Sequence, residues 1–210
     1  MIRLLLNADA PPSMAPVTRF GGLPLIPGDS NFQWPRCSGC GGHMQFLGQI
    51  ALEDHDAKRL VLLFMCQNDP GSCDDWNANS GGNRAMVVMP DRAPSLAEIP
   101  QDGLAVRETA HGAHLEEVDS ESYGDARKQW AQRNNCSPLQ ILGQFDGEPS
   151  WIQADETPTC DICGKRMQFL AQLEEGPDYK TAMNFGGGGC AYVFRCSCTQ
   201  HTAKFLWQCS

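Results

Sequence analysis

The sequence predicts an α+β fold that is mainly antiparallel β sheet and is built from two copies of one unit. A CxxC motif is followed by nearly the same seven residues in both halves of the chain, residues 44–50 (MQFLGQI) and 167–173 (MQFLAQL). In both copies the methionine lies four residues after the second cysteine. Self-similarity of this kind marks an internal repeat. Alternating apolar residues beside β-branched and aromatic runs are typical of antiparallel strands.

The similarity continues downstream of the repeated motif. Residues 61–66 (VLLFMC) match residues 191–196 (AYVFRC), and a further cysteine follows each run, Cys73 in the first half and Cys198 in the second. Another apolar run comes next in both halves. Upstream, Trp34 and Trp151 precede the CxxC motifs of their repeats, but at different distances in sequence. We therefore expect two pseudo-symmetric β units with the same order of elements.

The repeated strand is expected to present two faces. Alternation predicts that Met44, Phe46, Gly48 and Ile50 face one side, and that the residues between them face the other. The small residue at the same place in both copies, Gly48 or Ala171, is expected to let another segment pack closely against the strand.

The repeat suggests boundaries along the chain. We expect a first β unit over residues 1–90, a polar connector over residues 91–135 and a second β unit over residues 136–210, all within one compact domain. Acidic residues come early and basic residues late between Asp119 and Arg133, which favours a helix there. Asp119 or Ser120 is the expected N-cap of that helix.

The eleven cysteines predict metal binding rather than a disulfide framework. Their number is odd, and the short apolar run at the N-terminus does not resemble a secretion signal. Zinc prefers four thiolates in a tetrahedron, and a CxxC turn supplies two of them. Each β unit is therefore expected to carry a structural zinc knuckle made of four cysteines. The predicted ligands are Cys37, Cys40, Cys66 and Cys73 in site one, and Cys160, Cys163, Cys196 and Cys198 in site two.

The last ligands of site two remain open at this point, because a CxC pair is tighter than usual. Cys190 or His201 is an alternative ligand there. Cys136, Cys190 and Cys209 have no partner in the repeat, and we interpret them as small apolar residues.

Catalytic motifs are absent from the sequence. It contains no HExxH, GxSxG or Walker sequence, and four cysteine ligands leave zinc no open position for substrate. His111 and His114 are interpreted as part of a solvated loop. Two alternatives stay open: redox chemistry at the CxxC pairs, and an enzyme with an unrecognised site. The candidates for such a site are His43, His201, Asp155 and Glu156.

Charge narrows the choice of partners. The 210-residue chain has a formal net charge of −9, whereas nucleic-acid binding needs a basic surface. A basic protein or peptide partner is therefore favoured over nucleic acid. No run of 18 apolar residues predicts a membrane span, and we expect a cytoplasmic protein. The sequence does not indicate an oligomeric state.

Several of these segments together resemble the YwqG-like bacterial family of unknown function. They are residues 21–24 (GGLP), Trp34-Pro35, residues 44–50 and the C-terminal runs 191–196 and 205–208. The CxxC-Gly before the FL-Q strand, with a cysteine after a later apolar strand, is also similar to the programmed cell death protein 2 family. The resemblance implies a duplicated antiparallel β fold and a chaperone-like role towards a basic client. The leading hypothesis is a non-catalytic, zinc-stabilised binding protein.

Overall fold

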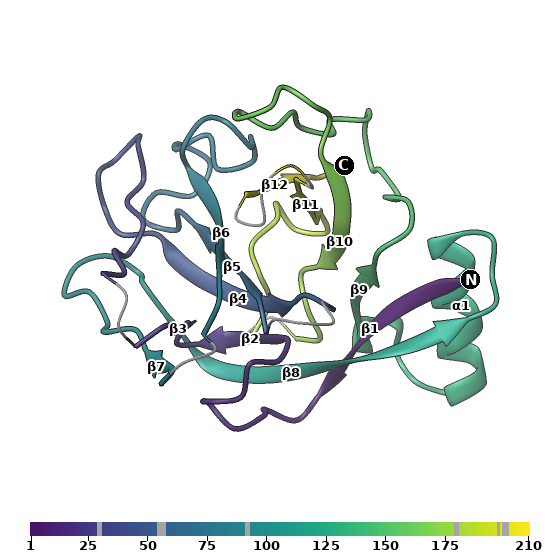
Figure 1. Cartoon of the computed structure of the whole chain (residues 1–210). Helices are drawn as coiled ribbons and strands as arrows, with labels where there is room; N and C mark the ends of the chain where they lie inside the picture. The colour runs from purple at the N-terminus through teal and green to yellow at the C-terminus, as the bar shows by residue number, and fades with distance from the viewer. Residues whose placement is uncertain (29–30, 54–57, 91–92, 179–180, 197, 199–201) are drawn as a thin grey trace.

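One ten-stranded antiparallel sheet runs through both halves of the chain (Figure 1). The computed structural model describes residues 1–28, 31–53, 58–90, 93–178, 181–196, 198 and 202–210. The order in the sheet is β12-β11-β10-β9-β1-β8-β2-β4-β5-β6. The strands are β1 (Ile2–Ala8), β2 (Arg19–Gly22), β4 (Gln45–Ala51), β5 (Leu60–Met65), β6 (Asn83–Val88), β8 (Arg107–Val118), β9 (Ile141–Phe145), β10 (Gln168–Glu174), β11 (Cys190–Arg195) and β12 (Ala203–Gln208). A small second sheet pairs β3 (Leu25–Ile26) with β7 (Ser95–Leu96).

The order of the strands is symmetric about the pair β1–β8. Outward from that pair, one side runs β9, β10, β11 and β12, and the other runs β2, β4, β5 and β6. The repeated heptapeptides form equivalent strands. β4 and β10 each cover seven residues and begin at the glutamine after the methionine. The prediction of a mainly antiparallel, duplicated fold is therefore confirmed. Its helical part is small, with one α-helix among the described residues.

The first strand of each repeat lies in the other half of the sheet. β1 pairs with β9, whereas β8 pairs with β2, and β1 and β8 pair with each other over seven residues. β8 is the longest strand and lies in the segment 91–135, which the sequence suggested as a polar connector. Neither half of the sheet is thus made from one continuous half of the chain.

The helix expected in the connector is present as α1 (Tyr123–Asn134). It begins later than expected: Ser122, rather than Asp119 or Ser120, is the N-cap, and its side chain accepts a hydrogen bond from the Asp125 amide. Asn135 ends the helix in a left-handed conformation. α1 packs on the outer face of β1 through buried side chains such as Trp130. Among the described residues, no helix is long and apolar enough to cross a membrane.

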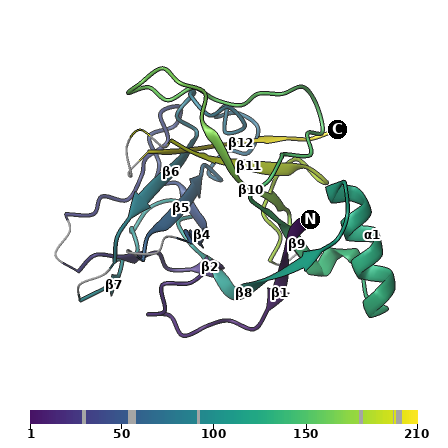
Figure 2. The same cartoon turned by 45° about the vertical axis from the view of Figure 1, so that its right-hand side comes forward.

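The sheet curls so that its two ends, β6 and β12, come together (Figures 1 and 2). The inner face encloses a core with side chains from both halves, including Phe20, Val61 and Phe205. The loop before β6 joins the ends, because the backbone amide of Trp207 donates to the carbonyl of Trp76 at 3.1 Å. The two indole rings also meet edge to face. One apolar core therefore serves both repeats.

The two tryptophans that precede the CxxC motifs occupy equivalent places on the outer face. The ring of Trp34 lies 5.5 Å from that of Phe64 on β5, and the ring of Trp151 lies 5.9 Å from that of Phe194 on β11. Phe64 and Phe194 are the fifth residues of their strands. The outer face of each half is thus covered by the same kind of aromatic cluster, although the tryptophans are differently spaced in sequence.

The expected alternation along the repeated strand is wrong at one point. Phe46 lies in the outer cluster, whereas Leu47 and Ile50 both lie in the inner core. The reason is a β-bulge between Phe46 and Gly48, at which the pairing with β5 shifts by one residue. Close packing at Gly48 is confirmed, because an added Cβ would lie 2.6 Å from the Phe20 ring.

The second glutamine of each repeated motif anchors the loop after the neighbouring strand. Gln49 and Gln172 are buried. The side-chain oxygen of Gln49 accepts from the Leu25 amide at 3.2 Å, and that of Gln172 accepts from the Ser150 amide at 2.9 Å. Gln49 also donates to the carbonyl of Val17 at 3.0 Å. This glutamine therefore has a structural role in both halves.

Replacing Gln49 with methionine is expected to lower the free energy of unfolding by about 2–4 kcal/mol, because two backbone groups lose their partner. Urea unfolding followed by circular dichroism measures the change. The control is Gln168→Met, since Gln168 is exposed on β10. Equal stabilities of the two variants would show that Gln49 does not anchor the loop.

Candidate metal centres

Each CxxC motif forms the same tight turn. The amide of Gly41 donates to the carbonyl of Cys37 at 2.9 Å, and the amide of Gly164 donates to that of Cys160 at 2.8 Å. Both glycines have positive φ, 74° and 68°, which glycine adopts without strain. The turn places the two cysteine side chains of the motif on one side of the chain.

The remaining cysteines come from the neighbouring hairpin. Cys66 directly follows β5 and Cys196 directly follows β11. The amide of Cys66 donates to the Gly82 carbonyl at 2.8 Å, so the end of the strand is fixed against the start of β6. Cys73 and Cys198 follow in the loops beyond. Both groups therefore combine a turn with the end of a strand.

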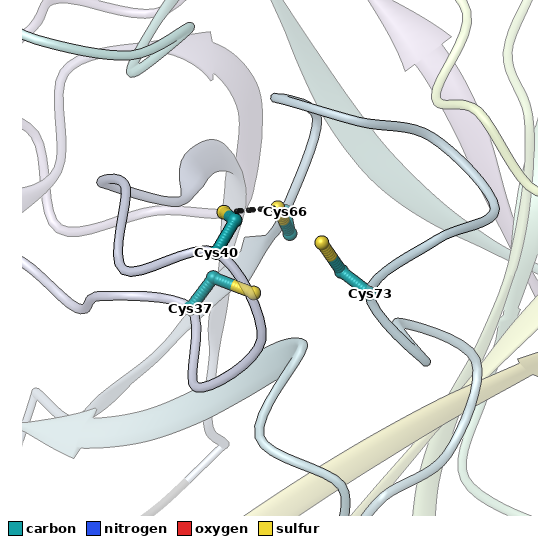
Figure 3. A group of neighbouring side chains, drawn as sticks. All are labelled: Cys37, Cys40, Cys66 and Cys73. Atoms are coloured by element: carbon teal, nitrogen blue, oxygen red, sulfur yellow. Dashed lines mark hydrogen bonds between the residues drawn. The ribbon is translucent and has the colours of Figure 1, made fainter.

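The four sulfurs of site one point toward one another (Figure 3). All four lie within 4.8 Å of one another, and the sulfurs of Cys40 and Cys66 are 3.7 Å apart. A tetrahedral zinc site with bonds of about 2.3 Å has sulfur–sulfur edges of about 3.8 Å. The arrangement of Cys37, Cys40, Cys66 and Cys73 has the dimensions that such an ion requires.

Site two repeats this arrangement with one difference. Its four sulfurs also lie within 4.8 Å of one another. The distances are 3.8 Å for Cys160–Cys198 and 3.7 Å for Cys163–Cys196, close to a tetrahedral edge. The CxC pair is tighter, since the sulfurs of Cys196 and Cys198 are 2.9 Å apart. That distance is longer than a disulfide bond of about 2.05 Å, and all eleven cysteines are free thiols.

Asn68 supports site one from outside the ligand set. Its side-chain amide lies 3.6 Å from the sulfurs of both Cys40 and Cys66 and donates to the His43 carbonyl at 3.1 Å. Its oxygen accepts from the Leu104 amide at 3.2 Å. Asn68 lies two residues after Cys66. At the equivalent position of the second half, two residues after Cys196, the chain has Cys198, the fourth cysteine of its group. Aligning the two repeats at this position would have identified Asn68, which our sequence reasoning missed.

The thiols of site one differ in acidity. A hydrogen bond from the Gly42 amide lowers the pKa of the Cys40 thiol to about 7. Burial raises the pKa of Cys66 and of Cys73. Buried thiolates are stable only beside a compensating positive charge, and a divalent cation between the four sulfurs would provide it.

The two sites differ in exposure, which predicts different rates of metal release. Three of the four cysteines of site one are buried, whereas site two has two buried, one half-buried and one exposed, Cys198. Cys40 of site one is exposed as well, but site two has fewer buried sulfurs, so a chelator should reach site two first. We expect the colorimetric chelator PAR to remove metal in two phases, with Cys198→Ser abolishing the fast phase and Cys73→Ser the slow one. The opposite assignment, or a single phase in the wild type, would contradict this ranking.

Of the two alternative ligands for site two, Cys190 and His201, the structure describes the position of Cys190. Cys190 begins β11 whereas Cys196 follows its end, and six positions along a strand span about 20 Å. Cys190 therefore does not replace a ligand of site two. His201 lies outside the described residues. Cys190 is buried as expected, and Cys136 and Cys209 are half-buried.

The candidate catalytic residues are not gathered into one constellation in the described part of the chain. His43 Nδ1 lies 2.5 Å from Asp102 beside site one. In the second half, Asp155 forms an ion pair with Arg166, and Glu156 accepts from the side chain of Gln208 at 3.0 Å. Each of these described side chains therefore has a structural partner.

The interpretation of His111 and His114 as a solvated loop is wrong, because both lie on β8. His114 is exposed, while the ring centroid of His111 lies 5.5 Å from that of Phe20. The two side chains therefore do not form a cluster. Burial, reinforced by Arg107, lowers the pKa of His111.

The lowered pKa of His111 predicts a pH dependence. The folded state disfavours the protonated ring. The contribution of His111 to the free energy of unfolding is therefore intact above its unfolded pKa of about 6.5 and becomes unfavourable as the pH falls below that value. His111→Phe keeps an aromatic ring against Phe20 and should lose less stability than the wild type between pH 7.5 and pH 5.5. Urea unfolding at both pH values tests this. Identical losses in the two proteins would contradict it.

Comparison with known proteins adds a limited result. No protein-family model matches the chain. A stretch of 71 residues is 35% identical to the uncharacterised protein YpfL of Salmonella typhimurium; it covers 32% of this chain and 15% of that protein. The chain is thus similar over part of its length to a bacterial protein of unknown function.

Proposed function

We propose that the chain is a non-catalytic, zinc-stabilised binding protein, with one structural zinc ion in each four-cysteine group. The observation that carries the proposal is the convergence of four sulfurs in each half, within 4.8 Å of one another. All-thiolate donor sets suit zinc, and four protein ligands complete its coordination. The ion would contribute folding energy and would leave no position for a substrate.

The partner in this proposal is a basic protein or peptide. The formal net charge of −9 supports it, because opposite charge speeds and strengthens association. A chaperone-like role, and a relation to the YwqG-like and programmed cell death protein 2 families, form part of the same proposal. They depend on the motif around residues 44–50 and on the cysteine pattern.

The first experiment is the zinc content of protein purified without a chelator or a metal-affinity tag, together with a count of reactive thiols. We expect two zinc ions per chain and eight thiols that react only after chelation or denaturation. Protein without zinc and with disulfide-paired cysteines would overturn the metal assignment. That outcome would support redox chemistry at the CxxC pairs instead.

The second experiment tests the partner. Crosslinking of the zinc-loaded protein in a bacterial lysate at low salt, followed by mass spectrometry, is expected to enrich basic proteins, and enrichment should weaken at high salt. An acidic protein of similar size and charge serves as the control. Equal capture by that control, or no enrichment, would count against a specific basic partner.

A further inference from the structure

A cleft of about 560 Å³ in the first half differs in charge from the rest of the protein. Among the described residues that line it, Arg36, His43 and Arg84 are basic and none is acidic. The chain as a whole has 25 aspartate and glutamate residues but 16 lysine and arginine residues. Its apolar lining comes from the half-buried Met86 and the exposed edge of Trp34, whereas Met44 lies almost fully buried behind them. The cleft therefore combines positive charge with apolar surface.

The basic residues of the cleft are not equally engaged. Arg36 and His43 both contact Asp102, at 3.4 Å and 2.5 Å. The side chain of Arg84 has no hydrogen bond or ion pair with any other described residue, and it is exposed. It is thus the cation of this cleft that has no counter-ion within the described chain.

The second repeat shows what the equivalent position requires. Arg84 pairs with Phe64 across β5 and β6, and Lys204 pairs with Phe194 across β11 and β12, so the two cations are equivalent. Lys204 Nζ lies 2.7 Å from the carboxylate of Asp161. Asp161 directly follows the first cysteine of its CxxC motif, where the first repeat has Ser38. The second repeat thus supplies a carboxylate that the first repeat lacks.

Another cleft, beside the second CxxC turn, contains charges of both signs. It has a volume of about 770 Å³ and is lined by Arg166 and Arg195 together with the acidic residues Asp146, Glu148 and Asp155. Arg166 is paired with Asp155. Of these two clefts, the one in the first half is lined by basic residues and by no acidic residue.

We propose that the cleft beside Arg84 binds a ligand carboxylate, which takes the place that Asp161 holds in the second repeat. The planar guanidinium of arginine matches a carboxylate through two parallel hydrogen bonds. The apolar surface of Met86 and of the edge of Trp34 favours a carboxylate next to a hydrophobic group. Such a group occurs at the C-terminus of a peptide, on an acidic side chain or in a free organic acid. This site is independent of the proposed basic partner.

The experiment uses three small probes and the zinc-loaded, ¹⁵N-labelled protein. N-acetylphenylalanine has a free carboxylate, N-acetylphenylalaninamide lacks it, and N-acetylaspartic acid amide has a side-chain carboxylate. We expect the first to shift the Trp34 indole and Arg84 side-chain signals and to bind at least tenfold more tightly than its amide. Comparing the first and third probes separates a terminal carboxylate from a side-chain carboxylate.

Two variants test the site itself. Arg84→Gln removes the cation, and Ser38→Asp places in the first repeat the carboxylate that the second repeat already has. Both are expected to weaken N-acetylphenylalanine binding at least tenfold, while the chain retains its zinc. The controls with matched charge changes outside the cleft are Lys58→Gln and Ser210→Asp, both at exposed positions, and they should bind as the wild type does.

Each contrary result overturns the proposal. Binding of the acid and the amide with equal affinity would exclude carboxylate recognition. No binding of either carboxylate probe to the wild type would exclude the site. Undiminished binding by folded, zinc-loaded Ser38→Asp would show that the comparison with Asp161 is wrong.

Discussion

Replacing Cys66 with serine is expected to reduce the zinc content from two ions to one and to destabilise the first half of the sheet. Cys66 is fully buried at the end of β5. A structural zinc site contributes roughly 10 kcal/mol in small zinc peptides, while whole domains are stable by about 5–15 kcal/mol. Loss of one zinc site therefore removes a large part of the free energy of unfolding, and we expect little folded protein at 37 °C. Mass spectrometry of the metal and thermal unfolding measure both effects.

The control for Cys66→Ser is Cys136→Ser. Cys136 is half-buried beside α1 and belongs to neither cysteine group. The Cys136→Ser variant should retain two zinc ions and have nearly the stability of the wild type. If Cys66→Ser retained two zinc ions and its melting temperature, the first cysteine group would not be a metal site.

Replacing Phe64 with alanine is expected to lower the free energy of unfolding by about 3–5 kcal/mol, as for other buried aromatic residues. Its side chain is fully buried, and its ring lies 5.3 Å from that of Phe46 and 5.5 Å from that of Trp34. The cavity would open in the apolar cluster that also contains Cys37, Cys66 and Cys73, but no sulfur would be removed. We therefore expect lower stability in urea but an unchanged zinc content at 25 °C.

The equivalent change in the second repeat, Phe194→Ala, should have an effect of similar size, because Phe194 is also fully buried and contacts Trp151 and Phe169. A loss below about 1 kcal/mol in both variants would show that the aromatic clusters do not stabilise the outer faces. Loss of zinc from the folded Phe64→Ala variant would instead show that packing and metal binding are coupled there.

Local features of the fold could be predicted from the sequence. The repeated motif identified β4 and β10 within one residue, and the CxxC turns identified half of each cysteine group. The bulge after Phe46 was not predictable, because it depends on pairing with β5, which is distant in sequence. β8 was missed because its outer face carries polar residues such as Glu116, which contacts Trp130 and Arg133 of α1.

Long-range features could not be predicted in the same way. Strand order is set by contacts between distant segments, so no local pattern indicated that β1 pairs with β9. The spacing of the last two cysteines differs between the halves, and that irregularity left the ligands of site two open. Asn68 carries no motif of its own and becomes recognisable only when the sequences of the two repeats are aligned at Cys66 and Cys196.

The exchange of β1 and β8 has a consequence for how such a molecule arises. A single copy of the repeat could not complete its own sheet, because its first strand belongs beside the second strand of another copy. Two identical copies would satisfy each other as a twofold symmetric, strand-swapped dimer. The present chain has the form of that dimer joined end to end, with the segment between β6 and β8 as the joint. A cut between β7 and β8 should accordingly give two fragments that reassemble when mixed, since β1 of the first pairs with β9 of the second and β8 of the second pairs with β2 of the first.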